Sequence, residues 1–330
     1  MNYFFKAATI AAIITAGQGV SAIELPDQIG DHAVLQQQSD AKLWGWAKPG
    51  AKVTVTPSWS KKAVTTTADK TGRWSLRVAT PAASYEPYSI TFAEGNDKLT
   101  INDILIGEVW LAAGQSNMEM PMRGFNSQPV EGAAADIARS GKLRDRVRMA
   151  YLVRGDEYEP QERIAGKWKV ASPENTPEFS AQGFYFAREL NDLIDVPVGI
   201  LCASYGGTQV EGWLPRDILD KYGYGAEADV PEPMRLAYRY TTKYNSMIHP
   251  LIGYTIKGFI WNQGESNAGN PPTYAKLLTD MVARWRSDWG DTENKLPFYQ
   301  TENPHFGWFN PTATPVSYTH LRAHETVLDL

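Results

Sequence analysis

One serine of this sequence follows an apolar run, and its position suggests a catalytic role more than that of any other residue. Val109 to Ala113 have the pattern of a buried strand, the run stops at Gly114, and Ser116 begins what should be a turn into a helix. An open α/β sheet binds its ligands at the carboxyl ends of its strands, where this turn would lie. Backbone N–H groups at such a turn can stabilise an oxyanion. Ser116 is therefore a candidate nucleophile, and the competing interpretation is a serine that only caps a helix.

Two further predicted strands end in clusters that could complete a site with Ser116. The first cluster runs from Ser204 to Thr208 and contains two adjacent glycines, and the second runs from Asn262 to Asn267. Parallel strands place their carboxyl ends at one edge of a sheet, so the clusters can converge. The glycines can bring backbone N–H groups close to a substrate, and the side-chain amides of the second cluster can donate hydrogen bonds. Three such clusters at one edge favour a catalytic site over ordinary loop chemistry.

Strands and helices alternate from about residue 102 onward, and this pattern predicts the sheet that would position these clusters. Alternation of this kind is typical of an α/β domain with a parallel sheet covered on both faces. The predicted strands after residue 114 are 147–153, 196–203, 255–261 and 297–300. The predicted helices are 180–194, 234–247 and 271–289, and the last has a strong amphipathic period.

Residues 23–103 instead show the period-two alternation and the turn residues of short β-strands. We therefore expect a small antiparallel β-sandwich domain there, followed by the α/β domain at 104–315. The tryptophans Trp44, Trp46 and Trp59 could form a sugar-binding surface. Since no polar cluster accompanies them, we favour a role in core or interdomain packing.

The composition limits the class of protein. A chain of 330 residues with a hydrophobic fraction of 43% can bury the cores of about two domains. The net charge of −5 argues against a nucleic-acid partner, which would require a basic face. Cys202 is the single cysteine, so no internal disulfide is possible, and its apolar surroundings predict a buried core residue.

Residues 1–22 have the features of a secretory signal peptide. Lys6 precedes the apolar run from Ala7 to Ala16, and small residues up to Ala22 form a candidate cleavage site. The apolar run is too short to span a membrane, and no later run is longer. We therefore expect a secreted or periplasmic protein that is cleaved near Ala22 and has no membrane span in its mature chain.

The clusters resemble those of the SGNH (GDSL-like) hydrolases, and specifically the sialate O-acetylesterase family. The resemblance rests on GQSNMEM (114–120), YGGTQVEGW (205–213) and WNQGESNA (261–268), of which the last is the most specific. DHAVLQQ (31–37) and KLWGWAKPGAKVTV (42–55) are similar to the N-terminal β-domain of that family. The resemblance implies a three-layer SGNH-hydrolase domain with a parallel sheet, preceded by the β-sandwich.

The resemblance also implies a reaction and a set of residues. Ser116 would attack the acetyl carbonyl of an O-acetylated sugar or glycan, and a histidine would take its proton and later activate water. Ser116 and Gly207 would donate backbone N–H groups to the oxyanion, and Gln263 would add its side-chain amide. No metal or other cofactor is implied, and no metal-binding motif occurs. The residues expected to shape the site are Asn117, Asn262, Glu265 and Asn267. Trp213 could contact sugar, but we favour a core position.

The catalytic histidine of that family lies in an Asp-x-x-His block near the C-terminus, and this sequence has no such block. None of the five histidines, His32, His249, His305, His320 and His324, follows an aspartate by three residues. His305 is the candidate by its position, and the general base is otherwise unassigned.

The segment SYTHLRAHETVLDL at 317–330 has no counterpart in the family. It resembles translated sequencing-adapter DNA, so we expect residues 316–330 to be artefactual, the hydrolase domain to be incomplete, and the activity to be at most weak. The alternative is a genuine divergent tail in which His320 or His324 supplies the base.

The sequence is compatible with several substrates of a carbohydrate O-acetylesterase and with functions outside that class. An O-acetylated sialic acid would need a cation for its carboxylate, and Arg123 is a candidate. An acetylxylan-type plant polysaccharide would not. A non-catalytic glycan-binding protein with the same fold is the alternative from a different class. A lipase-like esterase is less favoured, because the polar clusters do not suggest a tunnel for an acyl chain.

Overall fold

A long central strand organises the structure, a computed structural model that describes residues 23–224, 236–269 and 271–302. This strand is β7 (Asp97–Gly114), and its second half lies between β10 (Val198–Ser204) and β11 (Gly258–Asn262). Both neighbours pair with β7 in parallel. The alternation of apolar strands and helices thus correctly predicted an α/β fold with a mainly parallel sheet.

The parallel sheet continues outward on both sides of these three strands. β8 (Val147–Tyr151) pairs in parallel with β10, and β12 (Phe298–Gln300) pairs in parallel with β11. β9 (Trp168–Val170) forms an antiparallel edge next to β8. The carboxyl ends of β7, β10 and β11 therefore meet at one edge of the sheet.

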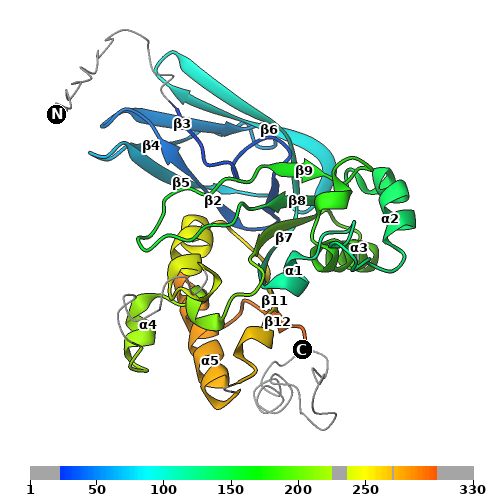
Figure 1. Ribbon diagram of the computed structural model, residues 1–330. Coiled ribbons are helices and arrows are strands. Elements are labelled where there is room, and N and C mark those ends of the chain that lie inside the picture. Colours follow the sequence, from blue (N-terminus) through cyan, green and yellow to red (C-terminus); the bar gives the residue numbers. More distant parts are fainter. Residues whose placement is uncertain (1–22, 225–235, 270, 303–330) are drawn as a thin grey trace, which may run out of the picture.

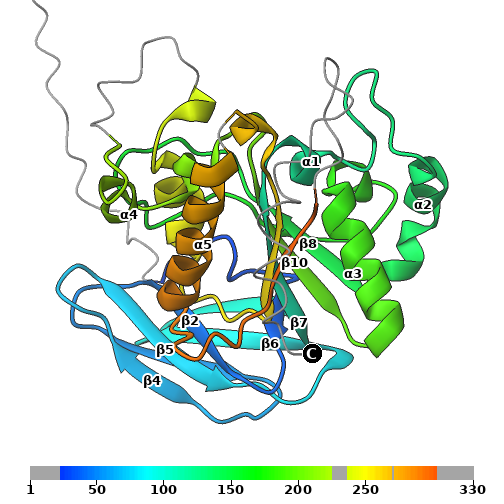
Figure 2. The same ribbon diagram turned by 90° about the horizontal axis from the view of Figure 1, so that it is seen from below.

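Helices cover both faces of this sheet, with α3 (Ala181–Ile194) on one face and α5 (Pro271–Asp288) on the other (Figure 2). The alternation of β7 side chains explains the two layers. Leu111 packs into the core on the α5 side, while Trp110 and Ala112 pack with Phe184 of α3. The buried residues of α5 are those of the predicted amphipathic face, namely Tyr274, Leu277, Leu278, Met281 and Trp285. The other short helices are α1 (Ser116–Glu119), α2 (Ala133–Arg139), α4 (Arg216–Asp220), η1 (Ser140–Leu143), η2 (Thr176–Glu178), η3 (Val210–Trp213) and η8 (Glu265–Asn267).

The helix predicted at 234–247 is wrong as a regular α-helix. Its described part contains the 3₁₀ turn η5 (Leu236–Tyr238) and most of the π-helical turn η6 (Tyr244–Ile248), and the 3₁₀ turn η7 (His249–Leu251) follows it. Thr241 has a φ of 66°, a left-handed conformation that a β-branched residue adopts only when the surrounding structure holds it. This residue lies between η5 and η6 and interrupts the predicted helix.

The strands of the first half lie around the first part of β7 (Figure 1). β3 (Lys52–Pro57) pairs antiparallel with β4 (Val64–Thr67) and β6 (Ser84–Glu94), and β6 pairs antiparallel with β7. β2 (Asp40–Trp46) and β5 (Arg73–Ala79) form a separate antiparallel pair, and β1 (Val34–Gln36) pairs with β7 in parallel. The expected boundary between residues 103 and 104 falls inside β7, so the chain passes between the two halves without a linker.

β7 is kinked at Asp103, where its antiparallel pairing with β6 shifts register, and its parallel pairing begins a few residues later, with β1 at Leu105 and with β10 at Glu108. Asp103 has a φ of 55°, and the pairing register with β6 shifts nearby. Its carboxylate accepts a hydrogen bond from the fully buried Arg148 at 2.7 Å and contacts His32 Nδ1 at 2.6 Å. Burial alone would raise the pKa of Asp103, but the hydrogen bonds from His32 and Arg148 outweigh it and lower that pKa.

The residues that we assigned to the core are mostly buried. Cys202 is inaccessible, and burial raises the pKa of its thiol to about 12, so it is a core residue as predicted. Trp44 is buried and makes an edge contact with Tyr254, with ring centroids 6.2 Å apart. Trp59 donates a hydrogen bond to the Ala79 carbonyl, and the Arg163 guanidinium lies over Trp46. None of the helices in the described ranges is both long and apolar enough to cross a membrane.

Candidate active site

Ser116 is the first residue of α1 and is partly exposed at the carboxyl end of β7. The strand-to-helix turn predicted from the sequence is therefore present. Gly114 has a φ of 144°, and a Cβ there would lie 2.1 Å from the Asn262 carbonyl oxygen. Only glycine allows the ends of β7 and β11 to approach this closely. The N–H of Gln115 donates to the same carbonyl at 2.9 Å, which fixes the turn to the end of β11.

The glycine cluster after β10 lies directly against Ser116. A Cβ built on Gly206 would lie 3.4 Å from the Cβ of Ser116. The preceding residue, Tyr205, donates its N–H to the Gly114 carbonyl at 3.0 Å. Gly207 has a φ of 76°, which glycine adopts without strain. These contacts bring the second predicted cluster to the first.

The cluster after β11 reaches the same place through side-chain hydrogen bonds. The Gln115 Oε1 accepts hydrogen bonds from the N–H groups of Gly264 and Ser266, both at 3.4 Å. The Asn117 amide donates to Glu265 Oε1 at 2.5 Å. All three clusters thus lie together at one edge of the sheet, which is the arrangement that the parallel topology implies.

Gln263 is not oriented as the resemblance implied. Its side chain is fully buried, and its amide nitrogen donates to the Thr208 carbonyl at 2.9 Å and to Asn267 Oδ1 at 2.8 Å. Both hydrogens of the amide are thereby engaged. This geometry does not support a direct donation from Gln263 to an oxyanion. It supports a role in tying the loop after β10 to the loop after β11.

Asn267 and Asn262 also use their side chains to hold loops and helices. The Asn267 amide donates to Glu211 Oε2 at 2.8 Å, and Asn267 Oδ1 accepts the Val210 N–H at 3.0 Å. The Asn262 amide donates to Gln182 of α3 at 2.7 Å. Trp213, near this network, is fully buried and donates to Thr208, in agreement with the core position that we favoured.

Two backbone donors at the site remain available. In the part of the chain that the structure describes, the N–H groups of Ser116 and Gly207 have no hydrogen-bond partner. The N–H of Gly206 is engaged, because it donates to Glu119 Oε2 at 2.8 Å. An oxyanion formed beside Ser116 could thus be stabilised by the first two groups.

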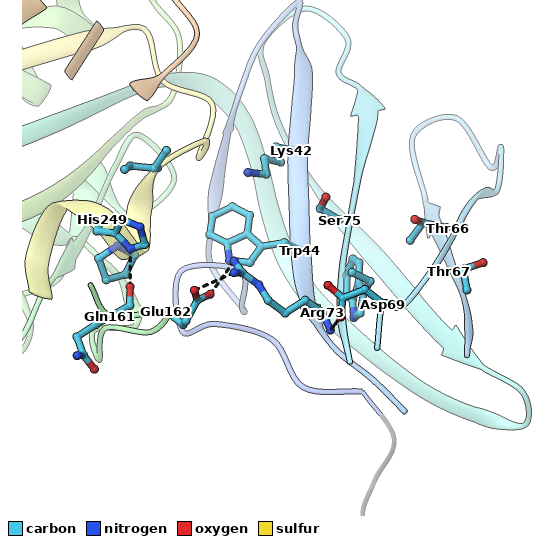
Figure 3. A pocket seen from close by; sticks show the side chains of 13 residues that line it. Lys42, Trp44, Thr66, Thr67, Asp69, Arg73, Ser75, Gln161, Glu162 and His249 are labelled. Atoms are coloured by element: carbon cyan, nitrogen blue, oxygen red, sulfur yellow. Dashed lines mark hydrogen bonds and ion pairs between the residues drawn. The ribbon is translucent and has the colours of Figure 1, made fainter. Parts of the chain in front are cut away.

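The two histidines within the described ranges lie elsewhere. His32 contacts Asp103 in the first half of the molecule. His249 Nδ1 is 2.8 Å from the Gln161 carbonyl oxygen. The side chain of His249 lines a cavity of about 340 Å³ next to Trp44 (Figure 3). Neither ring makes a hydrogen bond or an ion pair with the residues around Ser116. His305, His320 and His324 lie outside the described residues, so the predicted general base is untested.

An ion pair beside Ser116, between the buried Glu119 and the half-exposed Arg154, escaped the sequence analysis. Glu119 is 5% exposed, and its Oε1 accepts a hydrogen bond from Arg154 Nε at 2.6 Å. The signal that could have revealed it is a lone carboxylate three residues after Ser116, next to buried methionines. Its partner is distant in sequence and could not be identified from spacing.

The same ion pair lines a cavity of about 440 Å³. The other lining residues include the cations Arg123, Lys167 and Lys169 and the carboxylate of Glu178, which pairs with Arg123 at 2.7 Å. The cavity therefore has more positive than negative side chains, and the two lysines have no ion-pair partner within the described residues. Three aromatic rings complete its walls, those of Phe125, Tyr151 and Phe179.

Comparison with known proteins gives a consistent result. The family model for carbohydrate esterases described as sialic acid-specific acetylesterase matches residues 106–318. Sialate O-acetylesterases from Pongo abelii and Homo sapiens are 30% and 29% identical to this chain, and each alignment covers 82% of this chain and 55% of the relative. The chain thus spans about half the length of these relatives.

A solved structure supports the fold assignment. The crystal structure of a carbohydrate acetylesterase from Xanthomonas citri superposes with a TM-score of 0.75 and 33% sequence identity. The superposition covers 84% of this chain and 59% of that chain.

Proposed function

The chain belongs to the family of sialic acid-specific acetylesterases, a family of carbohydrate esterases, and we propose on this basis that it hydrolyses O-acetyl esters of sugars. The observation that carries the proposal is the proximity of Gly206 to Ser116. A Cβ built on Gly206 would lie 3.4 Å from the Cβ of the serine. The candidate nucleophile therefore lies beside a glycine turn in which the Gly207 N–H has no hydrogen-bond partner among the described residues. A serine that only capped a helix would not need such a neighbour.

The proposed reaction proceeds in two steps through an acetyl-serine. Ser116 Oγ attacks the acetyl carbonyl, and the oxyanion accepts hydrogen bonds from the N–H groups of Ser116 and Gly207. The sugar hydroxyl leaves with the proton that the serine lost. Water then attacks the acetyl-serine, which releases acetate and restores the hydroxyl. Both proton transfers need a general base, for which a histidine is expected and His305 is the sequence candidate.

An acidic sugar is the substrate class that the cavity beside Glu119 supports. Four cationic side chains line it, against two carboxylates that are already paired with two of them. A sugar carboxylate would therefore meet an attractive field there, and the aromatic walls suit the faces of a pyranose ring. O-acetylated sialic acid fits this description, whereas an acetylxylan-type polysaccharide has no charge to place in the cavity. Acetate release from the two substrates, measured side by side, distinguishes them.

Replacing Ser116 tests the activity itself. Ser116→Ala is expected to lower the rate of acetate release from an O-acetylated sugar by about 10³-fold or more, because the acetyl-serine cannot form. Binding of the sugar, measured by calorimetry, should survive the substitution. If the parent protein binds acetylated glycans but releases no acetate, the non-catalytic glycan-binding alternative is correct.

We also infer that the protein is exported to the periplasm or secreted. The support is the signal-peptide pattern of residues 1–22, which lie outside the described residues. Intact-mass measurement of protein recovered from the secreting host should show a mature N-terminus that follows Ala22. A full-length chain retained in the cytoplasm would contradict the inference.

A further inference from the structure

The glycine turn beside Ser116 needs an anchor if its N–H groups are to stabilise an oxyanion. Glycine has more backbone freedom than any other residue, and Gly206 and Gly207 are adjacent. Stabilisation of a developing charge requires donors that are already in place when the reaction begins. The contacts of the turn show what holds it.

Glu119 makes the contact that fixes this turn to the helix of the nucleophile. Its Oε2 accepts the N–H of Gly206 at 2.8 Å, and a Cβ built on Gly206 would also lie 2.8 Å from that oxygen. The carboxylate, the turn and Ser116 are therefore packed with no space for a side chain between them. Because Glu119 and Ser116 belong to the same short helix, the bond links the turn to the nucleophile directly.

Arg154 holds the carboxylate from its other side. Its Nε donates to Glu119 Oε1 at 2.6 Å, and its guanidinium lies 5.0 Å from the ring centroid of Tyr205, the residue before Gly206. A carboxylate that is 5% exposed needs hydrogen-bonding partners to offset the loss of its contacts with water. Arg154 thus contacts both the anchor and the start of the turn.

We propose that Glu119, held by Arg154, is a positioning residue that fixes the Gly206–Gly207 turn and thereby directs the Gly207 N–H to the oxyanion. The catalytic part of this inference rests on the proposed esterase function. The competing interpretation is an ion pair that only stabilises the fold and has no effect on the reaction. The two interpretations predict different effects of removing the Glu119 carboxylate on the turn and on kcat.

Amide hydrogen exchange tests the anchor without requiring turnover. In the parent protein the Gly206 N–H should exchange slowly, because it is hydrogen-bonded. In Glu119→Ala it should exchange at least tenfold faster, and the exchange of the neighbouring turn amides should rise with it. Unchanged protection of Gly206 in Glu119→Ala would overturn the inference, whether or not the protein is an esterase.

Kinetics then test the consequence for the reaction. Glu119→Ala should lower kcat on the order of tenfold to a hundredfold with little change in KM, since a misplaced donor weakens the transition state. Glu119→Gln keeps an acceptor for the Gly206 N–H and should recover part of that loss. A kcat within twofold of the parent in Glu119→Ala would refute the positioning role while the esterase function stands.

Glu108 supplies a matched control. It is also 5% exposed, and it accepts hydrogen bonds from Gln36 at 3.2 Å and from Gln37 at 2.7 Å. It lies in β7, about 20 Å from Gly114 at the rise of an extended strand. Glu108→Ala should lower the melting temperature and leave kcat and the protection of Gly206 unchanged. An equal loss of kcat in both variants would show that general destabilisation is the cause, and the inference would fail. Absence of acetate release from the parent would reject the esterase function alone.

Discussion

At the scale of single residues, the contact between Gly206 and Ser116 limits what the glycine turn can contain. The space that a side chain at Gly206 would occupy is bounded by Ser116 and by the Glu119 carboxylate. Gly207, by contrast, has open space around a built Cβ, with Ala237 at 3.8 Å, but its φ of 76° disfavours other residues. The two glycines are thus required for different reasons, one for space and the other for backbone conformation.

Gly206→Ala should therefore impair the site even though it adds only a methyl group. That methyl would meet Glu119 Oε2 at 2.8 Å, so the carboxylate or the turn must shift, and the hydrogen bond between them is disturbed. We expect a loss of kcat/KM on the order of a hundredfold, measured by acetate release. Gly141→Ala is the matched control, because a Cβ there meets only Pro173 at 3.7 Å. Retained activity in Gly206→Ala would mean that the turn can shift without cost.

Gln263 gives a second prediction at this scale. Gln263→Met keeps the volume but removes both donors, which leaves the Thr208 carbonyl without the hydrogen bond at 2.9 Å. The free energy of unfolding should fall by about 2–3 kcal/mol, measured by urea denaturation. Any loss of activity should accompany that destabilisation. A large loss of kcat with unchanged stability would instead support the direct oxyanion donation that the family resemblance implied.

At the scale of the elements, the sequence predicted the strands that precede the candidate site residues better than it predicted the connections between the two halves of the chain. The apolar run before Ser116 was sufficient to predict a strand, and the amphipathic period of α5 was sufficient to predict a helix, because burial imposes both patterns. The change of pattern at about residue 102 suggested a domain boundary, and in the structure this position lies inside β7, next to the kink at Asp103. Glu119 and Arg154 were missed, since a contact between residues 35 positions apart depends on tertiary packing.

The kink at Asp103 leads to a prediction about pH. Because the pKa of Asp103 is lowered in the folded protein, its ionisation stabilises the fold above the ordinary carboxyl pKa of about 4. That stabilisation is lost as the pH falls through the lowered, folded-state pKa. Asp103→Asn keeps a residue that tolerates a positive φ but removes the charge facing His32, Arg144 and Arg148.

The difference in unfolding free energy between the parent and Asp103→Asn should be largest near neutral pH and should shrink below about pH 4. Denaturant titrations at several pH values measure it. A difference that stays constant down to pH 2 would contradict an ionised, paired Asp103.

At the scale of the whole molecule, the two halves share one core. A single cluster of buried side chains includes Val53 and Trp74 from the first half and Trp261 and Trp285 from the second. Polar contacts cross between the halves as well. Tyr254 donates to the Val34 carbonyl at 2.8 Å, and the ion pair of Arg73 with Glu162 at 2.6 Å bounds the cavity of Figure 3.

The protein should consequently unfold as one unit. Differential scanning calorimetry is expected to show a single transition in which the calorimetric and van't Hoff enthalpies agree. Two separate domains joined near residue 103 would instead give two transitions. Limited proteolysis provides an independent check, because a cut inside β7 should not release a stable N-terminal fragment.

The continuity of β7 also constrains how the chain can change in length. Successive side chains of a strand face opposite sides, so one extra residue between Ile104 and Gly114 would exchange the two cores and turn the serine hydroxyl away from its neighbours. The bulge at Asp103 already accommodates a break in pairing and can absorb an added residue. Insertions and deletions should therefore be tolerated in the chain up to Asp103, whereas those between Ile104 and Gly114 should disrupt the site. The bulge at Asp103 is consequently the position at which a different N-terminal half could be joined to this edge of the sheet.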